Sequence, residues 1–169
     1  MLALSGPPVQ EGRHLMDSIG WAALLPQMLA SLGAVFLAAD VGRVVSDLVA
    51  QVIPMPSAFL AVVAYCAGMA LFTIIMGNAF AAFPVMNVAI GLPIVVHQFG
   101  GNSAIGMLAG FCGTLMTPMA ANFNAVPAKM LELLDRNAPL NGVIRAQLPT
   151  AAIMHVANIL LMYVLAFRF

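Results

Sequence analysis

The hydrophobic residues of this sequence fall into long apolar stretches that a few polar residues interrupt or end. Ile19 to Ala39 carries no charged residue and, at about 1.5 Å of rise per residue, is long enough to cross a hydrocarbon core of ~30 Å. Ala58 to Met76 has the same character, and Ser57 stands where it can cap the helix. Both stretches are predicted to be transmembrane helices.

A different pattern separates these two stretches. From Val41 to Ile53, apolar residues recur with a helical period among charged and polar ones. This period predicts an amphipathic helix that lies at the membrane interface. Pro54 is expected to end it, because proline lacks a backbone donor and clashes with the preceding helical turn.

The middle of the chain, Leu48 to Ala128, contains no Asp, Glu, Lys or Arg, yet polar residues, glycine and proline interrupt it in two clusters. The clusters are Gly77 to Pro84 and Gly113 to Asn124. An unpaired backbone group costs several kcal/mol in hydrocarbon, so broken helices at membrane depth must be buried in protein or line a water-filled cavity. Both clusters are therefore predicted to be helix breaks of the kind that bind solutes and ions in transporters.

The segment between the two clusters is predicted to be helical again. A helix resumes from Pro84 to Gln98 and ends at a Gly-Gly turn, and Asn102 or Ser103 caps the next helix. Small residues recur along that helix at three- or four-residue steps: Gly106, Gly110, Thr114, Thr117 and Ala121. Such a stripe allows close packing, so we expect it to face the helix that carries Gly77 and Asn78 and to bring the two breaks together.

The last part of the chain returns to water and then crosses the membrane once more. Lys129, Glu132 and Asp135 indicate an aqueous boundary, Arg136 to Ala146 is predicted to be a solvated loop, and Leu148 to Phe167 the final span. The positive-inside rule places Arg13 and the Lys129 to Arg145 loop on the cytoplasmic side.

Together these elements predict an all-α integral membrane protein with about five transmembrane helices, one or two of them discontinuous or re-entrant. Residues 1–18 form an exposed amino-terminal tail, and residues 19–169 form the helical membrane domain. Hydrophobic residues make up 63% of the chain and charged residues 7%, with a net charge of zero, which indicates a lipid bilayer as the environment and gives no sign of a nucleic-acid partner.

No catalytic grouping stands out in the sequence. Carboxylate pairs, Ser/His/Asp groupings and phosphate-binding loops are missing from the apolar region, so an enzyme is not expected. Cys66 and Cys112 lie in apolar stretches without a metal-ligand spacing, so no metal or cofactor is expected. His97 is interpreted as an interfacial residue, while the mid-span position of His155 leaves its role open.

The candidate substrate- or ion-binding residues come from the two clusters, together with the nearby Asn87. They are Gly77, Asn78, Asn87, Gly113, Thr114, Thr117, Asn122 and Asn124. Helix amino termini can hold a small anionic solute without a buried arginine, and free carbonyls with Asn or Thr oxygens can hold Na⁺; H⁺ is the other candidate coupling ion. The alternative is that each amide or hydroxyl only ties one helix to another.

The two clusters also share a short echo. Phe80 to Pro84 and Phe123 to Pro127 both read aromatic, any residue, Ala, apolar, Pro. Chance is the better explanation; a true echo would match the paired discontinuous helices of an internally repeated transporter.

Three runs of the sequence resemble a known family. They are Ile19 to Gln27, Met76 to Met86 and Gly110 to Asn124, and the last is the most specific. The family is the domain-of-unknown-function 979 type of bacterial membrane protein, regarded as one subunit of a two-subunit 5-oxoproline (pyroglutamate) transporter. The resemblance covers nearly everything after the tail. Because family members are roughly twice as long, the chain is expected to correspond to their carboxy-terminal half.

The resemblance implies a multi-pass subunit of a permease in the bacterial inner membrane, which works with a second, different membrane subunit. It also implies half of an ion-transporter-type fold with inverted halves and broken helices. The function expected is therefore secondary transport of a small organic anion or amino-acid derivative, with 5-oxoproline as the specific candidate. The alternative from another class is a non-transporting scaffold subunit, in which the broken helices only pack against the partner.

Overall fold

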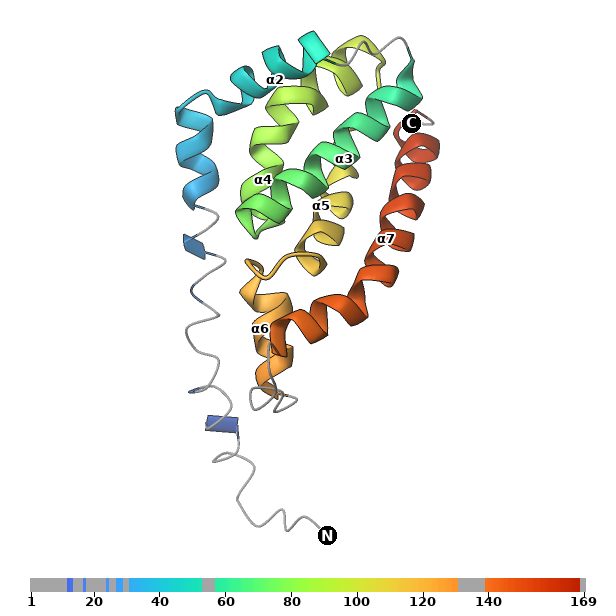
Figure 1. The fold of residues 1–169 in the computed structure, drawn as a ribbon. Coiled ribbons are helices and arrows are strands. Elements are labelled where there is room, and N and C mark those ends of the chain that lie inside the picture. The colour runs from blue at the N-terminus through green and yellow to red at the C-terminus, as the bar shows by residue number, and fades with distance from the viewer. Residues whose placement is uncertain are drawn as a thin grey trace.

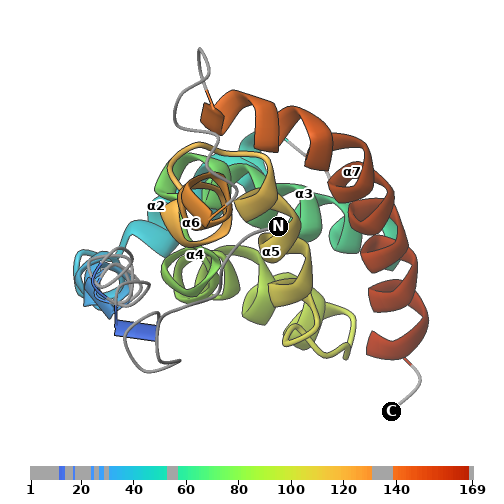
Figure 2. The same ribbon diagram turned by 90° about the horizontal axis from the view of Figure 1, so that it is seen from below.

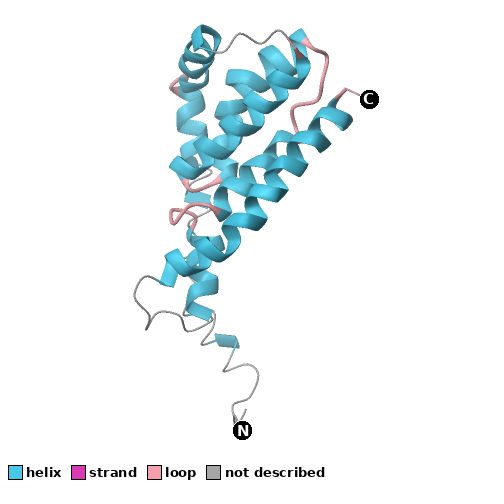
Figure 3. Cartoon of the chain, turned by 45° about the vertical axis from the view of Figure 1, so that its right-hand side comes forward, coloured by secondary structure: helices cyan, strands magenta, loops and turns pink. Residues whose placement is uncertain are grey.

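The computed structural model describes residues 12, 13, 17, 24, 27, 28, 31–52, 57–130 and 139–167. Within these ranges every regular element is a helix, as Figure 3 shows. The all-α fold class is confirmed. Most of the tail and most of the predicted span Ile19 to Ala39 lie outside the described residues, although residues 31–38 at the end of that span are helical.

Helix α2 (Val41–Val52) lies across one end of the molecule and runs in a different direction from the helix over residues 31–38 (Figure 1). Asp40 makes the corner between them with a left-handed φ of 55°, a conformation that Asp tolerates. Gly42 lets α2 approach its neighbour closely, because a Cβ there would lie 3.0 Å from Val88. The predicted amphipathic segment is thus helical, and its place at the membrane interface remains a prediction.

Helix α3 (Ala58–Met76) has the predicted bounds, and the Ser57 hydroxyl accepts a hydrogen bond from the Leu60 amide at 3.3 Å. After Gly77 and Asn78 the chain turns into α4 (Ala79–Met86), which continues without a gap as the π-helix η1 (Asn87–Gln98). This second limb runs back along α3. Gly68 faces Met86 and Ile90, while Gly91 faces Tyr65 further back.

The structure therefore corrects the interpretation of the first cluster. Gly77 and Asn78 form the turn of a helical hairpin, whereas the prediction was a helix broken at membrane depth. Pro84 also lies inside α4, where a helix interruption was predicted. The new helix begins at Ala79 because Asn78 caps it, so the proline falls in the second turn. The Asn87 amide then bonds to the carbonyls of both Phe83 and Pro84, where the helix widens to the π form.

The chain next forms two short helices separated by an interruption. They are α5 (Gly106–Leu115) and α6 (Ala121–Met130), with residues 116–120 between them. At about 1.5 Å per residue α5 covers about half of a hydrocarbon core. The helix interruption predicted in the second cluster is confirmed, and its place at membrane depth remains a prediction. The Asn102 side chain accepts a hydrogen bond from the Ala104 amide at 2.9 Å, ahead of α5, which has no side-chain cap of its own.

Helix α7 (Pro139–Ala166) is longer than predicted. Residues 139–146 were expected to be loop, but Pro139 opens the helix, a position that suits proline because its missing amide has no helical partner there. Residues 136–138 of the predicted loop lie outside the described residues. The helix curves from α6 at its start to the end of the molecule where α2 lies (Figure 1). Pro149 inside it removes one helical hydrogen bond.

Three helices among the described residues are long and apolar enough to cross a membrane: Ala58–Met76, Ala79–Gln98 and Gly142–Ala166. The expected count of about five spans is not confirmed, because α5 is too short and the first predicted span is largely outside the described residues. The outward face of α7 is apolar, with Ile153 71% and Val156 58% exposed. Such a surface is typical of a membrane protein.

The core lies around α3 and α5. Seen from below, α5 lies in the middle of the bundle, with α3, α4 and α7 around it (Figure 2). Tyr65, Met69 and Ile90 are among its largest fully buried side chains. This arrangement places the carboxy-terminal end of α5 beside the turn of the α3–α4 hairpin.

Candidate functional site

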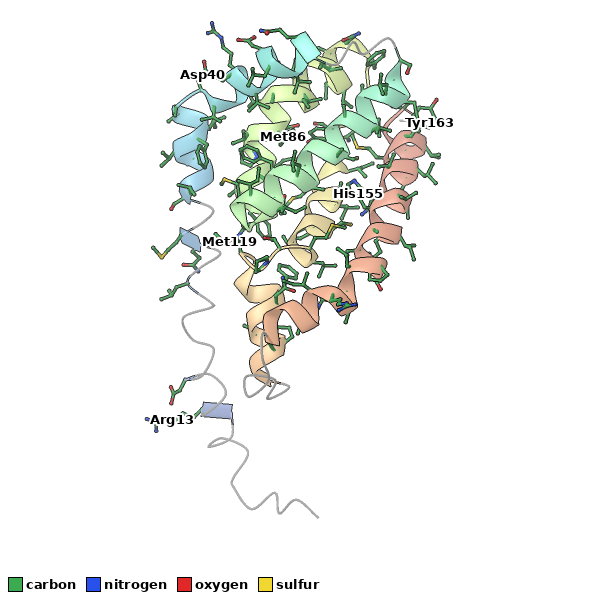
Figure 4. All side chains as sticks on the ribbon, in the orientation of Figure 1. Arg13, Asp40, Met86, Met119, His155 and Tyr163 are labelled. Atoms are coloured by element: carbon green, nitrogen blue, oxygen red, sulfur yellow. The ribbon has the colours of Figure 1, made fainter. Side chains whose placement is uncertain are left out.

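The α3–α4 turn at Gly77 and Asn78 lies against the interruption between α5 and α6 at residues 116–120, as the neighbouring loops in Figure 3 show. The place where these two regions meet is called the junction below. The Thr117 hydroxyl donates a hydrogen bond to the carbonyl oxygen of Ile74 at 2.9 Å. A Cβ added to Gly77 would lie 2.7 Å from the Met119 carbonyl oxygen. Figure 4 accordingly shows Met119 beside the lower end of the hairpin. The prediction that the two clusters meet is confirmed.

Close packing of α5 on α3 holds the interruptions together. A Cβ on Gly106 would overlap the Tyr65 ring, one on Gly110 would lie 2.8 Å from the Met69 methyl carbon, and one on Gly113 would touch the Ala70 carbonyl oxygen. The small-residue stripe therefore faces the hairpin as predicted. The Thr114 hydroxyl is turned to its own helix, where it bonds to the Phe111 carbonyl at 2.6 Å.

The hairpin turn pairs its polar groups locally. Gly77 adopts a φ of 76°, and its amide donates to the Thr73 carbonyl at 2.7 Å. The Asn78 side-chain oxygen accepts from the Phe80 amide at 2.7 Å and so caps α4. Asn78 is only 6% exposed. Its oxygen is therefore occupied in holding the turn.

The α5–α6 interruption depends on a buried side chain instead. The Asn124 amide nitrogen donates to the carbonyl oxygens of Thr114 at 3.1 Å and Thr117 at 2.6 Å, which pairs two groups that the helix end leaves free. The Asn124 Oδ1 atom is buried and finds no hydrogen-bond partner among the described residues, and the same holds for Thr73 Oγ1. An unpaired buried oxygen is costly, so these two atoms are candidates for pairing with a water or a bound molecule.

Aromatic rings connect the junction to a cavity. Phe111 lies 5.6 Å from Phe80 and 6.3 Å from Phe123, measured between ring centroids. Phe111 and Phe123 also line a cavity of about 390 Å³ between α5, α6 and α7. Phe80 and Phe123, which begin the two echoed segments, thus both contact the Phe111 ring. This contact does not show whether the echo reflects an internal repeat.

The cavity is mostly apolar and contains one amide side chain. Its walls include Phe111, Cys112, Phe123, Met154 and Asn158. The Asn158 nitrogen donates to the Leu108 carbonyl at 3.2 Å and contacts the Cys112 sulfur at 3.3 Å. This volume and lining are typical of small-molecule sites, which combine apolar walls with a few placed polar groups.

Most of the predicted site residues are gathered at this junction: Gly77, Asn78, Gly113, Thr114, Thr117 and Asn124. Asn87 is separate, because η1 carries it away from the turn to the neighbourhood of Gly91. The side chain of Asn122 lies outside the described residues. The sequence interpretation missed Thr73 and Asn158, which were recognisable as isolated polar side chains in otherwise apolar spans.

The chemistry that this site offers is binding by uncharged groups. Across the part of the chain that the structure describes, no three His, Cys, Asp or Glu side chains group as metal ligands do. His155, on the side of α7 that faces α5 (Figure 4), has a buried Nδ1 atom without a described hydrogen-bond partner. Amide and hydroxyl groups can orient a solute by donating and accepting hydrogen bonds.

Comparison with known proteins gives one match. A family model described as "Protein of unknown function (DUF979)" matches residues 4–167. No curated protein and no solved structure matches the chain. Because the family model covers nearly the whole sequence, the chain belongs to the DUF979 family of proteins of unknown function.

Proposed function

We propose that the chain is a subunit of a secondary transporter for a small organic anion or amino-acid derivative, with 5-oxoproline as the specific candidate. It acts in the bacterial inner membrane with a second, different membrane subunit. The observation that carries the proposal is the meeting of two chain interruptions beside a cavity of about 390 Å³. One of the two, between α5 and α6, is an interrupted helix, and interrupted helices are a common way of building solute sites in transporters.

The chemistry of the cavity fits a solute of this class. 5-Oxoproline is a five-membered lactam with a carboxylate, so its ring can pack on Phe111 and Phe123 while its amide pairs with an amide side chain such as Asn158. The amino-terminal end of α6 begins at Ala121, beside Phe123, and supplies partial positive charge for the carboxylate. Na⁺ or H⁺ is the coupling ion in this proposal.

The competing function is a scaffold subunit that carries no solute. It is favoured by the bonds that the interruptions make within the chain, from Thr117 to Ile74 and from Asn124 to two carbonyls. The apolar outward face of α7 would then serve only to bind the partner subunit, whereas in the transporter it contacts lipid or that partner.

Uptake of labelled 5-oxoproline by cells that carry both subunits distinguishes the two functions. Asn124→Ala removes the unpaired oxygen at the junction, and Asn102→Ala is the matched control because Asn102 is exposed and makes one local side-chain bond. Co-purification with the partner measures assembly. Lost uptake with assembly retained supports the transporter. Lost uptake only through failed assembly supports the scaffold, and uptake equal to that of cells without the subunits contradicts transport of 5-oxoproline.

A further inference from the structure

A second group of buried oxygens lies apart from the junction. Tyr65, in the middle of α3, is fully buried, and its hydroxyl has no hydrogen-bond partner among the described residues. The Oδ1 atom of Asn87, at the start of η1, is likewise buried and unpaired. A buried tyrosine hydroxyl normally finds a partner, so two such atoms in one place need an explanation.

Gly91 shows that these oxygens converge on one point. A Cβ at that glycine would overlap Asn87 Oδ1, and it would lie 3.2 Å from the Tyr65 ring carbon that carries the hydroxyl and 3.0 Å from the Ser103 Cβ. The first contact is with the unpaired oxygen of Asn87, and the second is with the carbon that carries the unpaired hydroxyl of Tyr65. Ser103 is 6% exposed and adds a hydroxyl-bearing side chain. Even a Cβ at position 91 would collide with these atoms, so their close approach requires glycine there.

The backbone around this point is also unusual. η1 is a π-helix of 12 residues, a form that is rare, usually limited to a single turn inside an α-helix, and frequent at functional sites. Pro93 lies inside it and cannot donate a hydrogen bond, which removes one of the donors that the carbonyls of the preceding turn would use. The π-helix therefore has one backbone donor fewer than an uninterrupted helix of the same length.

The two unpaired oxygens, of Tyr65 and Asn87, determine which ligand fits. Asn87 Oδ1 is only an acceptor, and the Tyr65 hydroxyl can turn its lone pairs toward a ligand. Between Leu48 and Ala128 the sequence has no Lys or Arg to balance an anion and no Asp or Glu to hold a divalent cation. A hard monovalent cation needs only oxygen ligands, and amide, hydroxyl and backbone oxygens hold Na⁺ in other membrane proteins.

We propose that Tyr65 and Asn87, with Ser103 beside them, form a binding site for Na⁺ between α3 and η1. The site is separate from the cavity beside the junction and does not depend on which solute the protein carries. It deepens the proposed transport function if Na⁺ is the coupling ion, and it stands without that function if Na⁺ only stabilises the fold.

Thermal unfolding of the full chain in detergent micelles tests the site directly. The unfolding midpoint is measured in NaCl, KCl and choline chloride at equal ionic strength. We expect NaCl to raise the midpoint progressively with concentration, because a ligand that binds only the folded state stabilises it by mass action. Choline chloride controls for ionic strength, and KCl measures selectivity.

Two variants and one control assign the effect to the site. Tyr65→Phe removes one oxygen and keeps the ring, so it should weaken the apparent Na⁺ affinity about tenfold, the factor of one net contact of hydrogen-bond strength. Asn87→Asp adds a negative charge and should enlarge the Na⁺-dependent shift. Tyr163→Phe, on the exposed side of α7, is the matched control and should retain the wild-type response.

Equal midpoints in NaCl and choline chloride would overturn the proposal, as would an equal shift in KCl or an undiminished Na⁺ response in Tyr65→Phe. If Asn87→Asp does not fold, Tyr65→Phe and its control still decide. Na⁺-dependent stability without 5-oxoproline uptake would support this site while contradicting the proposed function, so the two failures are distinguishable.

Discussion

The α3–α4 turn and the α5–α6 interruption contain similar residues but are stabilised in different ways. In the turn, Gly77 and Asn78 pair their polar groups with atoms no more than a few residues away. In the interruption, Thr117 bonds across to Ile74, and Asn124 reaches back to two carbonyls at the end of α5. The first region is a local structure, and the second exists only in the folded bundle.

This difference indicates which region is available for function. A turn whose caps are occupied has no polar group to offer a ligand without losing stability. The interruption keeps Asn124 Oδ1 unpaired and lies beside the cavity, so it can bind a molecule at no cost to its own bonds. Mutations that affect the two regions differently can test this distinction.

The largest effect is expected where α5 packs on the hairpin, because that contact brings the two regions together. Gly110→Leu inserts a side chain where even a Cβ would lie 2.8 Å from Met69, and should cost about 3 kcal/mol or more of unfolding free energy. Met107→Leu is the control, a near volume-conserving change at a half-buried position that should cost under ~1.5 kcal/mol. Denaturation in mixed micelles measures both. Equal losses would show that the glycine face of α5 does not set the packing.

The next effect concerns the contact between the turn and the interruption. Gly77→Ala places a Cβ against Met119 and strains a φ of 76°, so it should cost about 2 to 3 kcal/mol. Gly100→Ala is the matched control, because Gly100 has a φ of 70° but nothing within 4 Å of the added Cβ. Its cost should be about 1 kcal/mol, from strain alone. If unfolding measurements give the same loss for both, the contact with Met119 contributes nothing.

A smaller effect is expected in the interruption itself. Asn124→Ala leaves the carbonyls of Thr114 and Thr117 without their shared donor, which should cost about 2 kcal/mol. The unfolding free energy of this variant, with Asn102→Ala as control, checks the value. A loss of unfolding free energy as small as that of the control would mean that water takes the place of the Asn124 side chain and hydrates the two carbonyls.

The smallest effect is expected in the turn. Asn78→Ala removes the bond from the Phe80 amide, a helix cap whose loss typically costs about 1 kcal/mol. Uptake should fall no more than this loss of stability explains, since the Asn78 oxygen is occupied in capping. Uptake abolished in a variant that remains folded and assembled would place Asn78 in the binding site and contradict the distinction between the two regions.

The sequence predicts the elements well where particular residues mark their ends. Ser57 and Gly77 bound α3 at the predicted positions, since a capping hydroxyl and a glycine with positive φ are local signals. Pro139 was misinterpreted because charged residues around it indicated a loop, although proline is common in the first turn of a helix. No sequence signal predicted the π-helix, whose bonding pattern depends on its packing.

The site was only partly predictable, because distance along the chain differs from distance in the fold. Glycine, asparagine and proline mark a hairpin turn and a broken helix alike, and it is packing contacts such as that of Gly68 with Met86 that show that the chain reverses. Asn87 was grouped with Asn78, but the helix between them carries it about 13 Å away at about 1.5 Å per residue. The meeting of the interruptions was predictable, because the small residues of α5 required a close neighbour.

The central claim is that the α5–α6 interruption takes part in binding the solute. Because an interruption at membrane depth must be buried in protein or line a water-filled cavity, the exposed Met119 should face water on the path of the solute. Thiol labelling tests it in open membrane fragments that carry both subunits, with Cys66 and Cys112 replaced by alanine. Met119→Cys and Ile153→Cys introduce thiols at positions with similar exposure, 64% and 71%, one at the interruption and one on the outward face of α7. Met119→Cys should react faster with a charged, water-soluble thiol reagent, and 5-oxoproline should slow that reaction. A Met119→Cys thiol that reacts no faster than the Ile153→Cys thiol, or at a rate that 5-oxoproline leaves unchanged, would contradict the account.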